Sequence, residues 1–305
     1  MWSECLKSEA NGRQIVPCTW VFRCKRNPAG EIIKCKARIC LRGDLTIDDA
    51  NTHAPVVQWS TIRFFMICAM HSGWVTKSVD WVNAFPQAPL KEPVFMTTPR
   101  GFANEHRVNG CLRLNKSLCG SKFAPKNWCQ HLAEALFKIG FRECPFDKCL
   151  FHRKNMLMIL CVDDAGLAAP EEKDIENPVE ELRNEGFDLE LEGDFSTHLG
   201  IGIEENEDGT RWMTQKGLID RIIEATKMTD CNPNKTPTLT VALGSDKDGE
   251  PWDQSQWNCA SVVGMLLHVS NNTRPDVAFA VSQVARFTAC PKAVSYTHLT
   301  LPTKA

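Results

Sequence analysis

Three aspartates in this chain follow strand-like apolar stretches. Met156–Val162 is an apolar run of the length expected for a buried strand, and Asp163 and Asp164 come directly after it. Asp80 closes a similar stretch, Trp74–Val79. A carboxylate at the edge of a core is costly unless a cation, a partner charge or hydrogen bonds compensate it. The pattern therefore predicts a strand, a tight turn carrying two acids, and a returning strand, with a cation bound at the turn.

Three carboxylates support metal-assisted phosphoryl transfer. Magnesium prefers hard oxygen ligands and shares its shell with substrate phosphates, and two ions about 3.5 to 4 Å apart suit in-line displacement at phosphorus. The acids are not accompanied by a His or Cys cluster with metal-ligand spacing. The alternative is a solvated doublet of no special role, which is the expectation for Asp48-Asp49, Glu171-Glu172, Glu180-Glu181 and Glu204-Glu205.

The composition indicates a globular protein with a substantial core. The chain has 305 residues, of which 43% are hydrophobic and 24% charged, enough for one large or two ordinary domains. Apolar stretches stay short of the roughly 20 residues that span a bilayer, and the N-terminus lacks the features of a signal peptide. We therefore expect an intracellular protein with no targeting signal and no membrane partner. The 15 cysteines are scattered without a CxxC pair, which favours reduced, packed thiols.

The net charge of -2 conceals a segregation of charge along the chain. Two tracts, Cys18–Arg42 and Arg100–Lys154, are rich in lysine and arginine, whereas Glu171–Asp208 is strongly acidic. Such segregation is typical of a polyanion-binding face with a solvated far side, and ordinary surface variation is the alternative.

The first basic tract has the pattern of a β-hairpin. Thr19–Lys25 suits a strand, Arg26–Gly30 a turn and Glu31–Leu41 a return strand. Three basic side chains at spacing two share one face of the return strand: Lys34, Lys36 and Arg38. They can bind a triphosphate, or they can simply solvate an exposed sheet.

Helices are expected after the second basic tract. Ala124-Pro125 begins a helix with an apolar stripe that includes Trp128 and Leu132, and Gly140 ends it. Further stripes in the C-terminal third predict a mainly helical region there, after a linker at residues 232–251.

Ordered motifs along the chain point to a known family. They are Lys36-Ala37-Arg38, Ala54-Pro55-Val56-Val57, Thr61-Ile62-Arg63, Asp80 with Asn83-Ala84-Phe85, Pro99-Arg100-Gly101-Phe102, Lys116-Ser117-Leu118, Gly120, Lys122, Ala124-Pro125 with Trp128, Val162-Asp163-Asp164, Leu199-Gly200-Ile201 and Thr273–Ala280. With these motifs the chain resembles, from about Trp2 to Pro291, the reverse transcriptase domain of copia-type long-terminal-repeat retrotransposon Pol polyproteins.

The resemblance implies an α+β fold, the right-hand polymerase with fingers, palm and thumb. It implies that residues 1–17 are an N-terminal extension, 18–215 the interleaved fingers and palm, and 216–293 the thumb or C-terminal helical region. Residues 294–305, which contain the single tyrosine, resemble translated sequencing-adapter read-through and are expected to be a non-native tail. The protease, integrase and ribonuclease H parts of a polyprotein are not found here, so we expect a fragment.

The resemblance also implies the site residues. Asp80, Asp163 and Asp164 would be catalytic and would hold two Mg2+ ions, with Mn2+ as a substitute and with Asp164 as a supporting acid. Deoxynucleoside triphosphate would be bound by a second set of residues: Lys36, Arg38, Phe85 and Lys122. Phe85 would exclude a ribose 2′-hydroxyl, and ordinary core packing is the alternative for this side chain.

The implied function is that of an RNA-directed DNA polymerase, a nucleotidyltransferase. Its partners would be an RNA template, a DNA or RNA primer and deoxynucleoside triphosphates. The alternative is a catalytically decayed or repurposed fragment that binds nucleic acid without turnover. A two-metal nuclease is a third possibility, in which the basic hairpin and Phe85 have no obvious role.

Overall fold

The computed structural model describes residues 1–26, 32–47, 51–102, 109–161, 164–195, 197–198, 200–232, 251, 253 and 257–292. The chain divides into two compact units, Met1–Asp194 and Phe195–Ala305. Several predicted features lie outside the described residues: residues 27–30 of the hairpin turn, Val162 and Asp163, Leu199, most of the linker and the tail at 294–305. In the described part, no helix combines the length and the apolarity needed to cross a membrane.

A six-stranded antiparallel sheet forms the centre of the first unit, in the order β12-β5-β11-β10-β9-β8. Its strands are β5 (Val75–Trp81), β8 (Arg142–Glu143), β9 (Leu150–Arg153), β10 (Met156–Cys161), β11 (Asp164–Ala169) and β12 (Leu189–Leu191). The apolar run before the acids is therefore a strand, as predicted, and the segment after them returns beside it. The strand predicted before Asp80 is β5, which continues through that aspartate.

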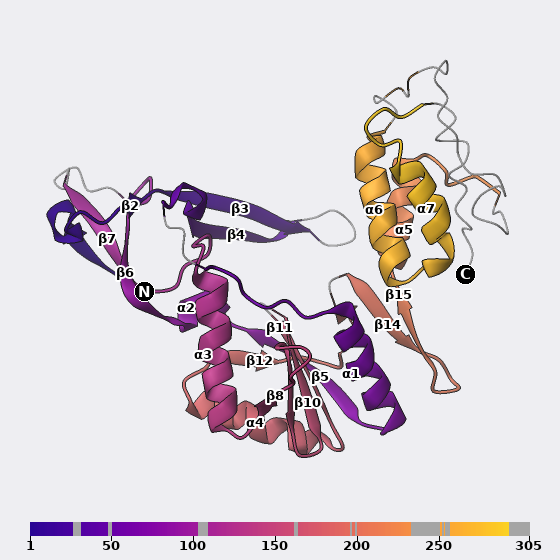
Figure 1. Ribbon diagram of the computed structural model, residues 1–305, viewed down its shortest axis with the longest axis horizontal. Coiled ribbons are helices and arrows are strands. Elements are labelled where there is room, and N and C mark those ends of the chain that lie inside the picture. Colours follow the sequence, from indigo (N-terminus) through magenta and orange to yellow (C-terminus); the bar gives the residue numbers. More distant parts are fainter. Residues whose placement is uncertain are drawn as a thin grey trace. The chain divides into compact units, whose positions relative to one another are not determined.

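Helices cover both faces of this sheet. Figure 1 shows α3 (Ala124–Lys138) and α1 (Trp59–His71) on opposite sides of it. The apolar stripe of α3, with Trp128 and Leu132 each 1% exposed, packs with α4 (Glu172–Asn184) into the main core, as predicted for α3. Gly140 ends α3 at a φ of 88°, a conformation that favours glycine.

A second, four-stranded sheet has the order β1-β7-β6-β2. Its strands are β1 (Trp2–Leu6), β2 (Ile15–Val16), β6 (Pro89–Met96) and β7 (Gly110–Lys116), and η1 (Lys7–Ala10) follows β1. Residues 1–17 thus contribute two strands to a sheet whose other strands come from residues 89–116.

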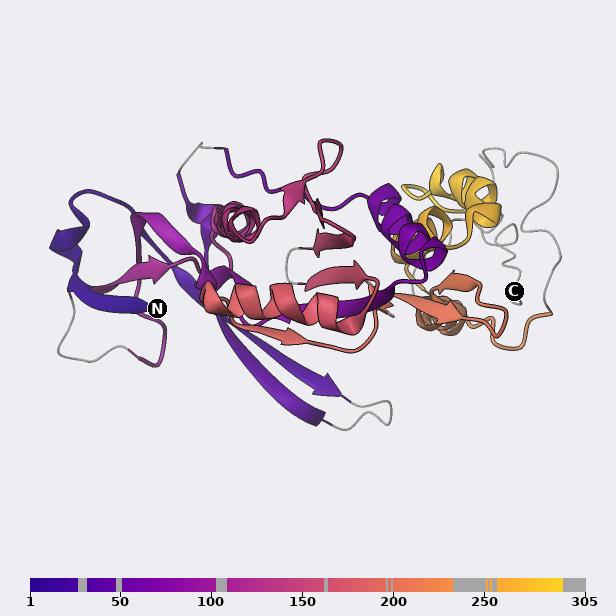
Figure 2. The same ribbon diagram turned by 90° about the horizontal axis from the view of Figure 1, so that it is seen from below.

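The predicted basic hairpin is present as a two-stranded sheet. β3 (Cys18–Arg26) pairs with β4 (Ile32–Leu41) in antiparallel register. Figures 1 and 2 show this hairpin extending outward from the rest of the first unit. Two short elements complete the unit: η2 (Gly43–Leu45) after the hairpin and α2 (Ala84–Gln87) after β5.

The second unit combines a small sheet with a helical core. The sheet contains β13 (Thr197–His198), β14 (Ile201–Glu205) and β15 (Arg211–Thr214), and the helices are α5 (Lys216–Ala225), α6 (Cys259–Asn272), η3 (Pro275–Val277) and α7 (Ala278–Ala285). Valine and leucine side chains from α6 and α7 pack against Ile222 of α5. The Asn258 side chain begins α6 by accepting a hydrogen bond from the Ser261 amide at 2.9 Å. The prediction of a mainly helical C-terminal third is confirmed for these residues.

Candidate active site

Asp80 and Asp164 lie opposite each other in the central sheet. Asp164 begins β11, and the antiparallel register pairs it directly with Asp80 of β5. Opposed residues point to the same face of an antiparallel sheet, with Cβ atoms about 4.5 to 5.5 Å apart. The structure therefore brings together two of the three aspartates identified in the sequence, at the end of the sheet where β10 ends and β11 begins. Asp164 is exposed and Asp80 is half-buried.

A further carboxylate lies beyond this pair. Glu190 of β12 is exposed and is opposed to Asp80 from the other side of β5. Nothing in the sequence indicated this residue, because a strand of three residues leaves little periodic signal. Within the described ranges, no three His, Cys, Asp or Glu side chains converge closely enough to hold a metal ion. Asp163, the third expected ligand, lies outside those ranges.

An aromatic core underlies the acidic end of the sheet. Trp81 follows Asp80, points to the opposite face and is 3% exposed. Its ring lies edge-on to Trp128 of α3, with the ring centroids 5.4 Å apart, and edge-on to Phe187, with the centroids 6.0 Å apart. The backbone that carries Asp80 is thus held by large rings packed in the preferred edge-to-face geometry.

Cys161 ends β10 and is opposed to Asp164 across the β10–β11 pair. Burial, and secondarily the negative charge of Asp164, raises the pKa of the Cys161 thiol to about 12. The thiol is therefore neutral at physiological pH and adds no charge beside the carboxylates.

A buried aspartate outside the predicted set anchors α1 beside this sheet. Asp147, 9% exposed, accepts hydrogen bonds from the Gln58 amide at 3.1 Å and the Thr61 hydroxyl at 2.5 Å. Its other carboxylate oxygen accepts from the Cys149 amide at 2.8 Å. The carboxylate thus supplies a long-range cap for the first turn of α1 and joins it to the β8–β9 connection. In the sequence Asp147 is a lone acid, with no spacing to suggest the contact.

Lys36 and Arg38 lie on one face of β4, as their spacing predicts. Arg38 is exposed, and Arg23 of β3 lies opposite Lys36, which extends the basic face across both strands. The two residues belong to the hairpin, a strand pair separate from the sheet that carries Asp80 and Asp164.

Lys122 lies where the base of the hairpin meets the segment that leads into α3. The Leu41 amide donates to the Cys119 carbonyl at 2.8 Å, and the Gly43 amide donates to the Gly120 carbonyl at 3.1 Å. The Lys122 ammonium donates to the Thr46 carbonyl at 2.7 Å. The lysine is therefore held against the loop that follows the hairpin.

Phe85 lies on α2 and is half-buried against the main core. Asn83, with a φ of 53°, turns the chain between β5 and α2. The Gln87 amide nitrogen donates to the Val82 and Asp188 carbonyls at 2.8 Å each, which fastens α2 to the chain before β12. The structure thus shows a packing role for Phe85, and a role in sugar selection stays a prediction.

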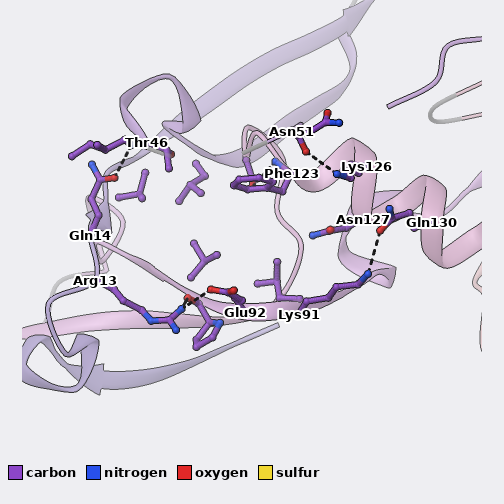
Figure 3. Close-up of a pocket in the computed structure, with 17 residues that line it drawn as sticks. Arg13, Gln14, Thr46, Asn51, Lys91, Glu92, Phe123, Lys126, Asn127 and Gln130 are labelled. Carbon is purple, nitrogen blue, oxygen red and sulfur yellow. Dashed lines mark hydrogen bonds and ion pairs between the residues drawn. The ribbon is translucent and has the colours of Figure 1, made fainter. Parts of the chain in front are cut away.

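Two cavities lie near these elements. The larger, of about 780 Å³, is lined by β6, the loop after η2 and the start of α3, and it includes Phe123 and Lys126 (Figure 3). Neither Asp80 nor Asp164 is among its described lining residues. The smaller cavity, of about 390 Å³, reaches Asp164 and Cys161. Because carboxylates supply the reactive chemistry, the acidic end of the sheet is the better candidate for an active site.

Comparisons with known proteins show what the chain as a whole is similar to. The family model described as reverse transcriptase (RNA-dependent DNA polymerase) matches residues 4–240. The retrovirus-related Pol polyprotein from transposon RE1 of Arabidopsis thaliana is 28% identical over 285 residues, covering 91% of this chain and 19% of that protein. The retrovirus-related Pol polyprotein from transposon TNT 1-94 of Nicotiana tabacum is 27% identical over 293 residues. The alignment covers 92% of this chain and 22% of that protein.

Among solved structures, a foamy viral protease-reverse transcriptase in complex with double-stranded DNA aligns with a TM-score of 0.40 and 12% identity. The alignment covers 90% of this chain and 46% of that one.

The match over most of the chain identifies the family. This protein belongs to the reverse transcriptase (RNA-dependent DNA polymerase) family. Its relatives include retrotransposon Pol polyproteins of the copia type, so the resemblance inferred from the motifs is confirmed. The chain spans about a fifth of the length of these curated relatives.

Proposed function

We propose that this chain is the RNA-directed DNA polymerase unit of a retrotransposon Pol polyprotein. The observation that carries the proposal is the direct opposition of Asp80 and Asp164 at one end of an antiparallel sheet. Family membership supports it, because the members share a named polymerase activity. The partners are an RNA template, a DNA or RNA primer and deoxynucleoside triphosphates.

The acids would hold the divalent cations, with Asp80 and Asp163 as the ligands of both ions and Asp164 as a supporting acid. Their hard carboxylate oxygens fit magnesium, and the same ligands accept manganese. The chemistry that bound magnesium would supply is a lower pKa for the primer 3′-hydroxyl and charge compensation for the triphosphate and the leaving pyrophosphate. The protein contributes position and charge, and the Trp81 core keeps the strand under Asp80 rigid.

The basic and aromatic residues select the nucleotide. Lys36 and Arg38 contact the triphosphate from the basic face of the hairpin, because their positive charges complement the phosphates. Lys122 exchanges the Thr46 carbonyl for a nucleotide oxygen. Phe85 lies beneath the sugar and leaves no room for a 2′-hydroxyl.

This assignment also divides the chain into functional parts, whose bounds differ from those of the two compact units. Residues 18–215 form the fingers and palm, with the six-stranded sheet as the palm and the basic hairpin as part of the fingers. Residues 216–293 form the thumb or C-terminal helical region.

Magnesium-dependent primer extension on an RNA template tests the proposal. We expect the full chain to extend the primer, and Asp80→Asn and Asp163→Asn each to reduce extension by roughly a hundredfold or more. Glu176→Gln, a change of an exposed acid on α4, is the matched control and should leave extension unchanged.

The alternative function is nucleic-acid binding by a decayed or repurposed fragment. It predicts that the folded chain binds a primer–template without extending it in either magnesium or manganese. Fluorescence anisotropy on the same duplex measures binding separately from extension. Binding without extension would favour this alternative over the polymerase.

A further inference from the structure

The basic hairpin has a second face that the proposed function does not use. Side chains alternate along β3 and β4, so the face opposite Arg23 and Lys36 carries Cys24 and Cys35. These cysteines are opposed to each other in the register, and their sulfur atoms are 3.7 Å apart. Both side chains are exposed.

The backbone geometry of this pair suits a disulfide. Opposed residues of an antiparallel pair have Cα atoms about 4.5 to 5.5 Å apart, and disulfides form at Cα separations of roughly 4.4 to 6.8 Å. Bringing the two sulfur atoms to bonding distance therefore requires side-chain rotation and no change of strand register. Exposure allows a small oxidant to reach either sulfur.

We propose that Cys24 and Cys35 are a redox modification site that closes to a disulfide and fastens the two strands of the hairpin. The oxidant is a low-molecular-weight disulfide of the glutathione type. One cysteine, as its thiolate, attacks the glutathione disulfide, forms a mixed disulfide and releases one glutathione thiolate. The second cysteine loses its proton to solvent, attacks the protein sulfur and releases the second glutathione, which takes up a proton. The protein loses two hydrogens, and one oxidised glutathione becomes two reduced molecules.

Another opposed cysteine pair in the chain provides an internal comparison. Cys5 of β1 faces Cys111 of β7, with sulfur atoms 3.3 Å apart. Cys111 is 1% exposed, and burial raises the pKa of its thiol to about 11. The pKa of the Cys24 thiol is raised as well, mainly by its hydrogen bond with Cys35, but neither sulfur of that pair is buried. Because exchange needs both access and a thiolate, Cys5 and Cys111 should react more slowly even though their sulfur atoms are closer.

The crosslink has a specific effect on the hairpin. β3 and β4 pair only with each other in the described structure, and an isolated strand pair is marginally stable. A covalent link between Cys24 and Cys35 limits the separation of the strands on either side of it. The pairs that include Arg23 with Lys36, and Val21 with Arg38, are then held in register.

The test is controlled oxidation of the reduced full chain with oxidised glutathione. Free thiols are alkylated, the remaining disulfides are reduced and labelled with a second reagent, and peptides are mapped by mass spectrometry. We expect an intramolecular Cys24–Cys35 link to form before any Cys5–Cys111 link and to reverse with dithiothreitol. Hydrogen exchange of the β3 and β4 amides should slow by roughly tenfold or more.

Three results would overturn the proposal. They are full alkylation of both cysteines after oxidation, persistent mixed disulfides with glutathione, and links to other cysteines or between chains on non-reducing gels. Cys24→Ser and Cys35→Ser are the matched controls, and each should leave its remaining partner as a mixed disulfide. The readout is independent of polymerase activity, so failure here and failure of the proposed function are distinguishable.

Discussion

Asp80 and Asp164 are opposed residues of adjacent antiparallel strands, so two carboxylates share one face of the sheet across a single strand-to-strand spacing. Like charges opposed across a strand pair destabilise it by a few tenths to about 1 kcal/mol. The arrangement therefore has a structural cost that a bound cation can offset.

Removal of one of these opposed charges should stabilise the fold. Asp164→Asn should raise the free energy of unfolding by about 0.5 kcal/mol in the absence of divalent cations, because it removes the repulsion between the carboxylates of Asp80 and Asp164. Urea denaturation in EDTA measures the change. Adding magnesium should reduce the difference in unfolding free energy between the variant and the wild type, since magnesium binding to the native wild-type site stabilises the wild-type fold. A variant less stable than wild type in EDTA would contradict the repulsion.

Gly120 is predicted to tolerate no side chain. Its φ is 85°, and a Cβ built there would lie 2.1 Å from the Leu41 carbonyl oxygen. Gly120→Ala should therefore cost about 2 to 4 kcal/mol of stability, through both backbone strain and displacement of the hairpin base. Gly186→Ala is the control, because its φ of 94° carries the same kind of strain but its Cβ would meet nothing within 4 Å. It should cost about 1 to 2 kcal/mol, and equal losses for the two variants would argue against the close contact.

Asp147 is predicted to matter for stability rather than chemistry. Asp147→Ala leaves the Gln58 and Cys149 amides and the Thr61 hydroxyl without their acceptor, so we expect a loss of about 3 kcal/mol. Asp188→Ala, at an exposed side chain, should change the free energy of unfolding by less than about 0.5 kcal/mol. Thermal and urea denaturation both report the difference, and a neutral Asp147→Ala would show that α1 is not capped in this way.

His131 should make the stability of the protein depend on pH in the mildly acidic range. Burial, with a smaller contribution from the positive charge of Lys116, lowers the pKa of His131, whose ring stacks on Phe187 at 4.9 Å. A lowered folded-state pKa means that the unfolded chain binds the proton first. Stability is then fully present above the unfolded value of about 6.5 and falls as the pH drops from there through the folded pKa. His131→Gln should flatten this slope, as measured by urea denaturation at a series of pH values, and an unchanged slope would contradict the assignment to His131.

Substitution of Phe85 can distinguish its proposed role in sugar selection from its role in core packing. Phe85→Val should increase incorporation of ribonucleotides relative to deoxynucleotides by at least about tenfold, because it removes bulk beneath the sugar. It should also destabilise the fold by about 1 to 3 kcal/mol, since Phe85 packs on the main core. Leu182→Ala, in the same core, should lower stability without changing sugar preference. An unchanged ratio for Phe85→Val would leave packing as its whole role.

Local sequence determined a large part of this protein. The apolar run before Asp163 and Asp164, the alternation of Lys34, Lys36 and Arg38, and the stripe of α3 each predicted an element that the structure contains. These features are readable because the periods of strands and helices act over neighbouring residues. The ordered motifs likewise indicated the family, which the match over residues 4–240 confirms.

Only the tertiary structure decided which distant residues meet. Strand register brings Asp80 opposite both Asp164 and Glu190, and it brings Cys24 opposite Cys35. Loop packing places Asp147 at the first turn of α1. Register is set by the burial of whole faces and by turn geometry. A shift of one residue in the pairing would move every side chain of a strand to the other face of the sheet. No spacing along the chain encodes such contacts, so the sequence identified the acids and the fold determined how they face each other.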